Sequence, residues 1–295
     1  MNKRILLAPA GWECRFEKGV YFDLKEFCPS TILIPFSQIY SQRTLPIRNR
    51  IRAKAQTMGI EYIETEHDYY DAISLYNSVL KTFEENVFNA EKIRFNTTTT
   101  PRDFIWYALH FLSEKKIPTE FSYFRPLDYG AYLSRDARSP RLVLKRSGIA
   151  YPDQPTCILV LSGFDEERLS QLKHRYEPKK MLIGRQIGDQ LNNNVRNTHT
   201  QQDSTGNRVY FDFDCFDTIE NSINLLREKI NTLTEPHNII AASLGPKPSA
   251  LILFELTQLM PEIGLVYIPA GDYSLHYSWG INFSNRILTE IPWHL

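Results

Sequence analysis

One strand–loop–helix pattern occurs twice in this chain of 295 residues, and this repetition constrains the fold more than any other feature. The clearer copy, IIAASLGPKPSALILFE, covers residues 239–255. It reads as a buried parallel strand, a Gly/Pro turn and a helix rich in Leu and Ile. A weaker copy, IRFNTTTTPRDFIWYAL, covers residues 93–109. The match continues beyond each helix, because residues 128–134 align with residues 272–278.

Further segments of the two halves correspond in the same order. They are apolar strands at 5–10 and 157–161, apolar strands at 31–36 and 181–183, and amphipathic helices at 69–88 and 217–230, which precede the repeated strand. Apolar strands that alternate with amphipathic helices favour parallel sheets, because a right-handed crossover places a helix between parallel strands. We therefore predict an α/β fold with two tandem Rossmann-like units, related by an internal pseudo-twofold duplication.

The duplication also predicts the domain boundaries. The first unit is expected to cover residues 1–134 and the second residues 156–295. Residues 135–155, which mix charge, Gly and Pro around a short apolar run, are expected to form a connector between them. The only polar low-complexity stretch, at 190–207, is predicted to be a surface insertion in the second unit.

Composition restricts the classes of partner. Lys plus Arg and Asp plus Glu number 34 each, so net charge does not indicate direct binding to DNA or RNA, and a charged ligand needs a local site. The four cysteines show neither C-x-x-C spacing nor a compact Cys/His set. No run approaches 18 apolar residues, and the apolar run after Lys3 and Arg4 is too short for a secretory signal. We expect a cytoplasmic protein with reduced thiols and no membrane association.

In an open parallel sheet, ligands bind at the carboxyl ends of the strands, where the strand order reverses. The loop at 11–13 is expected to meet the loop at 96–100 there, and the loop at 163–165 is expected to meet the loop at 243–247. The threonines offer hydroxyls and N–H groups at a helix N-terminus, and Ser243-Leu-Gly-Pro-Lys offers a hydroxyl, a bare backbone and an ammonium, which together suit a phosphate. Alternatively, these side chains only cap the helices.

Other residues could also belong to the candidate site, and each of them allows two interpretations. Tyr129 and Tyr273 follow the last strands and could stack on a base or pack at the sheet edge. Arg102 and the basic residues of the connector could neutralise phosphates or remain on the solvated surface. The predicted ligand-binding residues are Gly11, Trp12, Glu13, Thr97, Thr98, Thr99, Thr100, Arg102, Tyr129, Gly163, Asp165, Ser243, Gly245, Lys247 and Tyr273.

Known catalytic motifs are missing from the sequence. It contains no G-x-G-x-x-G after a strand, no G-x-x-x-x-G-K-[ST], no H-E-x-x-H and no G-x-S-x-G. No cofactor and no catalytic residue is assigned. Asp212, Asp214 and Asp217 could bind a divalent ion, but a strand followed by a helix cap explains them more simply, so no metal site is predicted. The basic run at 43–54 is either a phosphate-facing edge or the solvated face of a helix.

Paired units with a Ser/Thr/Gly/Lys loop that opens a late helix resemble the CARF-like sensor domains of prokaryotic antiviral systems. The residues that carry the likeness are Ser243, Gly245, Pro246 and Lys247, the threonines at 97–100, and the loops at 11–13 and 163–165. The layout is similar to the SAVED arrangement, in which two such units are fused. The resemblance implies a cyclic or linear oligonucleotide held across two units, slow ligand cleavage in some members, and an effector. No span is left here for an effector domain, so a separate effector subunit or other protein partner is expected.

Three functions follow from these expectations. The first is a nucleotide- or oligonucleotide-binding sensor in a prokaryotic antiviral defence or stress system, with the ligand between the units. The second is an enzyme that acts on nucleotide phosphodiesters or nucleosides, with Glu13 or Asp165 as general base. The third is a scaffold subunit of a protein complex, with an empty crevice.

Overall fold

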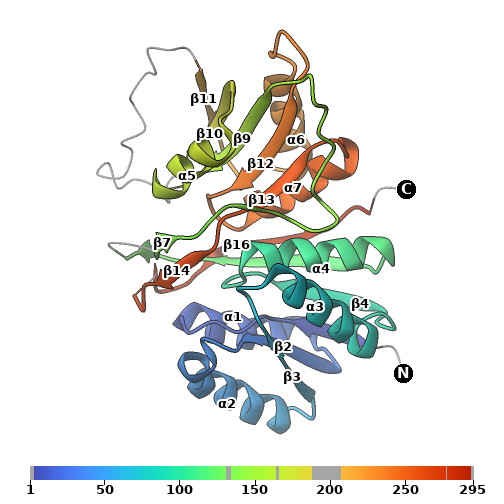
Figure 1. The fold of residues 1–295 in the computed structure, drawn as a ribbon. Coiled ribbons are helices and arrows are strands. Elements are labelled where there is room, and N and C mark those ends of the chain that lie inside the picture. Colours follow the sequence, from blue (N-terminus) through green and yellow to red (C-terminus); the bar gives the residue numbers. More distant parts are fainter. Residues whose placement is uncertain (1–2, 131–133, 164–165, 188–206, 277, 294–295) are drawn as a thin grey trace. The chain divides into compact units, whose positions relative to one another are not determined.

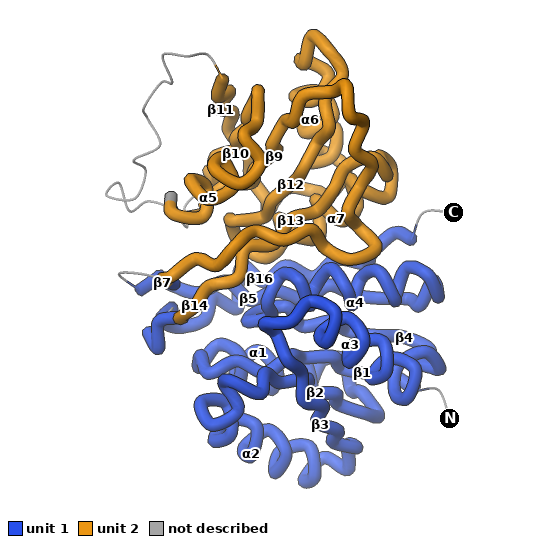
Figure 2. The backbone as a smooth tube through the Cα atoms, in the orientation of Figure 1, with its two compact units in different colours: residues 1–134, 273–295 blue, residues 135–272 orange. Residues whose placement is uncertain are grey.

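The computed structural model describes residues 3–130, 134–163, 166–187, 207–276 and 278–293. The chain divides into two compact units, coloured separately in Figure 2. Unit 1 comprises Met1–Ser134 together with Tyr273–Leu295, and unit 2 comprises Arg135–Asp272. The chain therefore leaves unit 1, forms unit 2, and returns to unit 1.

Unit 1 is built on a six-stranded sheet in the order β16-β5-β4-β1-β2-β3, labelled in Figure 1. Its strands are β1 (Arg4–Leu7), β2 (Thr31–Ser37), β3 (Glu61–His67), β4 (Lys92–Asn96), β5 (Thr119–Arg125) and β16 (Asn282–Glu290). The first five are parallel, and β16 is antiparallel to β5. The connecting helices are α1 (Cys14–Phe27), α2 (Ser41–Thr57), α3 (Ala72–Asn86) and α4 (Arg102–Glu114).

Unit 2 contains a second six-stranded sheet, in the order β11-β10-β9-β12-β13-β8. Its strands are β8 (Arg141–Leu142), β9 (Thr156–Ser162), β10 (Lys180–Gln186), β11 (Arg208–Phe213), β12 (Asn238–Ser243) and β13 (Gly264–Tyr267). All are parallel except β8, which is antiparallel to β13. The helices are α5 (Glu166–Tyr176), α6 (Ile219–Ile230) and α7 (Pro248–Leu259).

Two small two-stranded sheets complete the described fold. In one, β14 (Ala270–Tyr273) pairs with β7 (Ser134–Ala137), so the two segments that join the units pair with each other. In the other, β15 (Ser278–Trp279) is antiparallel to β6 (Asp128–Tyr129). The second sheet brings residues from the end of the chain beside the end of β5 in unit 1.

The strand order is the same in both large sheets. The first parallel strand of each unit, β1 or β9, lies between the second and the fourth, and an antiparallel strand closes the edge beside the fifth. This is a Rossmann-like α/β arrangement, so the predicted fold class is confirmed at that level. After its second strand unit 1 has α2, and the corresponding stretch of unit 2 contains the expected insertion at 190–207, of which residues 190–206 lie outside the described residues.

Burial explains why the apolar runs form central strands. Ile5, Leu6 and Leu7 of β1 are fully buried, as are four residues of β9. In unit 1, α1 and α2 contact each other, and so do α3 and α4 (Figure 1). The apolar side chains of α1 and α2 form one core with those of β1 and β2. Helices on the sheet faces exclude water from both sides of these strands, which is why their sequences are continuously apolar.

The basic run at 43–54 belongs to α2 and forms ion pairs within unit 1. Arg50 binds Glu17 through two hydrogen bonds of 2.7 and 2.8 Å, and Arg48 and Arg52 both pair with Glu64. The apolar side of the same helix is buried. These contacts agree with the interpretation of this run as an amphipathic helix. The guanidinium groups of Arg48, Arg50 and Arg52 bind carboxylates of the same unit, which disfavours the phosphate interpretation.

The expected boundary of the second unit requires a correction. The repeat places residues 273–295 in the second unit, but they group with unit 1, because β16 forms the edge strand beside β5. The expected connector at 135–155 belongs to unit 2, because β8 pairs with β13 and Val143 donates its N–H to Leu265. The antiparallel edge strand of unit 1, β16, thus follows its last parallel strand in the sequence, whereas that of unit 2, β8, precedes its first parallel strand.

Among the helices in the described part of the chain, none combines the length and the apolar character needed to cross a membrane.

Candidate functional site

The loops after β1 and β4 meet at the carboxyl edge of the unit 1 sheet. The two strands are parallel neighbours, with Leu7 beside Phe95. A Cβ atom on Gly11 would lie 2.4 Å from Oγ1 and 2.5 Å from Cβ of Thr99. The order β2-β1-β4 means that successive crossovers run in opposite directions from β1, so this is the switch point at which Rossmann-like sheets bind ligands.

Replacing Gly11 with Ala is expected to destabilise unit 1 by about 1–3 kcal/mol, because the new methyl group overlaps the Thr99 side chain. The measurement is urea denaturation followed by tryptophan fluorescence. Thr99→Gly in the Gly11→Ala background removes the overlapping atoms and should recover part of the loss. An equal loss with and without the second substitution would mean that the two loops do not contact each other in this way.

Most threonine hydroxyls of the second loop bind the backbone. Thr97 donates to the carbonyl of Ser122 at 3.1 Å, and Thr100 donates to the carbonyl of Asn96 at 3.3 Å. The hydroxyl of Thr98 accepts the N–H of Phe124 at 3.2 Å. The buried Oγ1 of Thr99 has no hydrogen-bond partner among the described residues. These bonds tie the loop to β5 and favour the capping interpretation of the threonines over the phosphate interpretation.

Carboxylates occupy the same edge. Asp103, in the first turn of α4, is buried and accepts the N–H of Phe104 at 2.9 Å. Glu13 precedes α1, and its carboxylate pairs with Arg15 at 2.9 Å and accepts a hydrogen bond from Ser278. Arg15 is buried and also donates to the carbonyl of Phe124. A negative charge near a helix N-terminus is favourable, so Asp103 already supplies the anion there.

Beside these loops, three rings and a guanidinium form what we call the aromatic cluster: Trp12, Tyr40, Tyr273 and Arg43. The ring centroids are 5.1 Å apart for Trp12 and Tyr40, 6.2 Å for Trp12 and Tyr273, and 6.0 Å for Tyr40 and Tyr273. The Arg43 guanidinium lies 5.2 Å from the Tyr40 ring and 5.7 Å from the Trp12 ring. The rings are half-buried and Arg43 is exposed, so the cluster presents a surface to solvent.

Three parts of unit 1 position the aromatic cluster. Trp12 follows β1, and Tyr40 follows β2 at the start of α2, where Arg43 lies in the first turn. The indole of Trp12 donates to the carbonyl of Ser274 at 3.3 Å, and Arg43 donates to that of Tyr273 at 3.4 Å. Burial, together with a hydrogen bond to Tyr70, raises the pKa of Tyr40 well above its usual value, so this phenol remains neutral. Sequence reasoning selects Trp12 and Tyr273 and considers Arg43 only as part of the basic run at 43–54, but it misses Tyr40, whose position directly after β2 is the available signal.

Two further predicted residues of unit 1 belong to regular elements of the fold. Tyr129 is in β6, opposite Ser278 of β15. Arg102 begins α4 and is buried.

In unit 2, the loops after β9 and β12 also meet, as expected. A Cβ atom on Gly163 would lie 2.5 Å from the carbonyl oxygen of Leu244, and Gly245 donates its N–H to Leu161 at 2.9 Å. The hydroxyls of Ser243 and Ser249 are 2.6 Å apart. Lys247 is the half-buried N-cap of α7. The loop after β12 is therefore fixed by hydrogen bonds to β9 and to the start of α7. Asp165, the remaining predicted residue of this unit, lies outside the described residues.

The aspartates considered as metal ligands have separate partners. Asp212 pairs with Arg185 at 2.9 Å, Asp214 accepts from the amide of Gln186, and Asp217 accepts from Asn221. Within the described ranges, no group of three His, Cys, Asp or Glu side chains is arranged to hold a metal ion.

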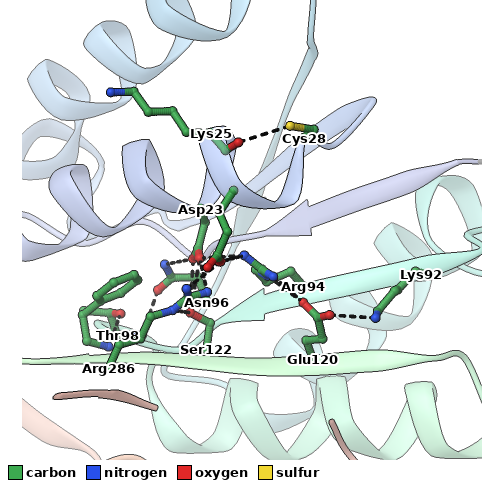
Figure 3. A network of polar contacts seen from close by, with 12 residues as sticks. Asp23, Lys25, Cys28, Lys92, Arg94, Asn96, Thr98, Glu120, Ser122 and Arg286 are labelled. Atoms are coloured by element: carbon green, nitrogen blue, oxygen red, sulfur yellow. Dashed lines mark hydrogen bonds and ion pairs between the residues drawn. The ribbon is translucent and has the colours of Figure 1, made fainter. Parts of the chain in front are cut away.

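A buried charge network adjoins the threonine loop of unit 1 through Asn96 and is centred on Asp23 of α1 (Figure 3). The Asp23 carboxylate, which is fully buried, accepts from Arg286 at 2.7 Å, Asn96 at 2.7 Å, Ser122 at 3.2 Å and Arg94 at 3.4 Å. Burial raises the pKa of Asp23 to about 6, and the two arginines oppose the shift.

Acidic side chains at the rim balance the two arginines of this network. Glu26 binds both Arg94 and Arg286, and Glu120 binds Arg94 at 2.6 Å and Lys92 at 2.7 Å. The network joins α1, β4, β5 and β16 and thereby attaches the returning segment to the sheet. Sequence analysis does not identify it, because its members are dispersed over more than 260 positions, from Asp23 to Arg286.

Comparison with known proteins assigns no family to the chain. No family model matches it, and no curated protein matches it. Among solved structures, a CobK precorrin-6A reductase is 11% identical, with 89% of this chain and 86% of that chain covered, at a TM-score of 0.30. A universal stress protein from Archaeoglobus fulgidus is 13% identical, with 91% of this chain and 97% of that chain covered, at a TM-score of 0.27. These likenesses are too weak to support a functional conclusion.

Proposed function

We propose that this chain is a nucleotide- or oligonucleotide-binding sensor whose ligand contacts the aromatic cluster of unit 1. The observation that carries the proposal is the position of Trp12, Tyr40 and Arg43 after β1 and β2, at the carboxyl edge of a Rossmann-like sheet, where Trp12 adjoins the switch point between β1 and β4. Indole, phenol and guanidinium planes are the groups on which proteins stack unpaired bases. The exposure of Arg43 leaves one side of the cluster open to a ligand.

The fuller form of the proposal includes the second unit. We propose that the two units arose by duplication, which the identical strand order of their sheets supports. In this form the ligand contacts both units, and the Ser243–Lys247 loop is the counterpart in unit 2. The role in prokaryotic antiviral defence, and the protein partner or effector subunit that it requires, rest on the resemblance to CARF-like and SAVED proteins.

The enzymatic alternative gains no support from the described contacts. A general base must be able to reach the proton that it removes. The Glu13 carboxylate binds both Arg15 and Ser278, and these contacts give it a structural role instead of directing it toward a substrate proton.

Binding of mononucleotides, linear dinucleotides and cyclic oligonucleotides can be measured by isothermal titration. Trp12→Ala is expected to weaken binding of the best ligand by about tenfold or more, because base–aromatic stacking contributes roughly 1–3 kcal/mol per base. Trp279→Ala is the matched control, since Trp279 is 53% exposed and stacks on His276 rather than on the cluster. Equal affinities of the two variants would contradict the assignment of the site, and no binding of any nucleotide would favour a scaffold with an empty crevice.

A further inference from the structure

The aromatic cluster and the threonine loop differ in what they can offer a nucleotide. The cluster presents three ring planes and an exposed guanidinium, whereas the hydroxyls of Thr97, Thr98 and Thr100 are bonded to the backbone. On this basis we infer that unit 1 recognises the uncharged base of its ligand and does not bind a phosphate through the threonine loop. This inference rests on the proposed function and narrows the ligand class of unit 1 to nucleosides and the base portion of nucleotides.

Charge on the loop side of the site disfavours phosphate. The carboxylates of Glu13 and Asp103 lie at the starts of α1 and α4, the two helices that follow the switch-point strands. Asp103 is 1% exposed, and the Glu13 side chain is 8% exposed. Two buried cations lie at this edge: Arg15 pairs with Glu13 at 2.9 Å, and Arg102 begins α4 beside Asp103. The carboxylates thus already match the arginines in number, so a phosphate in this loop would add an unbalanced negative charge at a poorly solvated position.

The geometry of the cluster also excludes a methylated ammonium as its preferred ligand. Aromatic cages for such cations hold the ligand between separate rings. Here the centroids are only 5.1–6.2 Å apart, so the rings contact one another instead of surrounding a space. Arg43 already supplies a cation to the faces of Trp12 and Tyr40. A ligand can therefore only stack against an outer ring face of the aromatic cluster, and a planar base is suited to this kind of contact.

Recognition of a base alone has a measurable signature. A nucleoside should bind within about threefold of its 5′-monophosphate, because the threonine loop does not bind the phosphate and solvent screens the attraction of the exposed Arg43. Raising the salt from about 50 to about 200 mM should change the Kd by less than about twofold, whereas phosphate contacts give a steep salt dependence. Inorganic phosphate and ribose 5-phosphate should not compete with the nucleoside.

The experiment is a titration of the full chain with a nucleoside, its 5′-monophosphate and ribose 5-phosphate at both salt concentrations. Two variants separate the two parts of the site. Tyr40→Ala removes a stacking plane and should weaken nucleoside and nucleotide equally. Thr99→Val keeps the shape of the side chain and removes the hydroxyl that has no partner among the described residues, and it should leave both affinities unchanged.

Two results would overturn the inference in distinguishable ways. If the monophosphate binds but the nucleoside does not, and Thr99→Val weakens that binding, phosphate recognition by the loop is established; the inference then fails while the proposed function stands. If neither compound binds at either salt concentration, the inference fails together with the proposed function. Circular dichroism of both variants checks that lost binding does not reflect an unfolded unit 1.

Discussion

Asp23→Ala is expected to lower the free energy of unfolding of unit 1 by about 1–3 kcal/mol at pH 7.5, because it leaves the buried donors that point at this carboxylate without their acceptor. Asp23 is fully buried and accepts hydrogen bonds from Arg94 and Arg286. Above its pKa of about 6 the side chain is ionised, so the variant removes a charge and not only a hydrogen-bonding group. The quantity to measure is the urea midpoint of the fluorescence transition, together with its slope.

Lys25→Ala is the matched control for this prediction, because Lys25 lies on the same helix and is exposed. Its effect should stay within about 0.5 kcal/mol, as for surface positions generally. Asp23→Ala with Arg286→Met should cost less than the sum of the two single variants, because the two side chains contact each other. A loss below about 1 kcal/mol for Asp23→Ala would show that the network contributes little to folding.

Glu255→Gln is expected to stabilise unit 2 above pH 8 and to change the pH dependence of its unfolding. Glu255 lies in α7 and is fully buried. Burial raises the pKa of its carboxyl from 4.5 to about 8, and the nearby charge of Arg146 opposes that shift. The folded state therefore holds a proton that the unfolded chain releases at lower pH, so the stability from protonated Glu255 is fully present below pH 4.5 and is lost as the pH rises through 8.

The amide that Glu255→Gln introduces stays neutral at every pH, so the difference in unfolding free energy between variant and wild type should increase from pH 4 to pH 9. By linkage, the total change is on the order of 3–5 kcal/mol. Urea denaturation at several pH values measures it. Glu228→Gln, at an exposed position of α6, is the control and should follow the wild-type curve. A pH-independent difference for Glu255→Gln would mean that the pKa of Glu255 is the same in the folded and unfolded states.

Much of the fold can be predicted from the sequence because the central strands are continuously apolar. Runs such as TILIPF at residues 31–36 and the strand before Gly163 can be buried on both faces only in a parallel sheet. The approach of Gly11 to the threonine loop is also predictable, since parallel strands end at the same edge. The sequence segments that correspond between the two halves occur in the same order, and the strands that they form have the same order in both sheets.

What cannot be predicted depends on long-range pairing and on hydrogen-bond direction. The sequence places residues 273–295 in the second unit, because the repeat aligns residues 128–134 with residues 272–278, and the pairing of β16 with β5 is a long-range contact that this alignment does not show. The four threonines suggest a phosphate site, but hydroxyls can also bind nearby backbone, and only coordinates show which partner is used. The amphipathic pattern puts Arg43 on a solvated helix face, although its position in the first turn of α2 sets it over two rings.

The return of residues 273–293 to unit 1 has a consequence for the order in which a ribosome delivers the protein. Arg135–Asp272, the whole of unit 2, are synthesised before the strand that completes the sheet begun at Arg4. A nascent chain released early would carry β5 with an open edge, and such edges pair with other chains. Unit 2 can therefore fold before β16 is synthesised, whereas unit 1 cannot complete its sheet until β16 has left the ribosome.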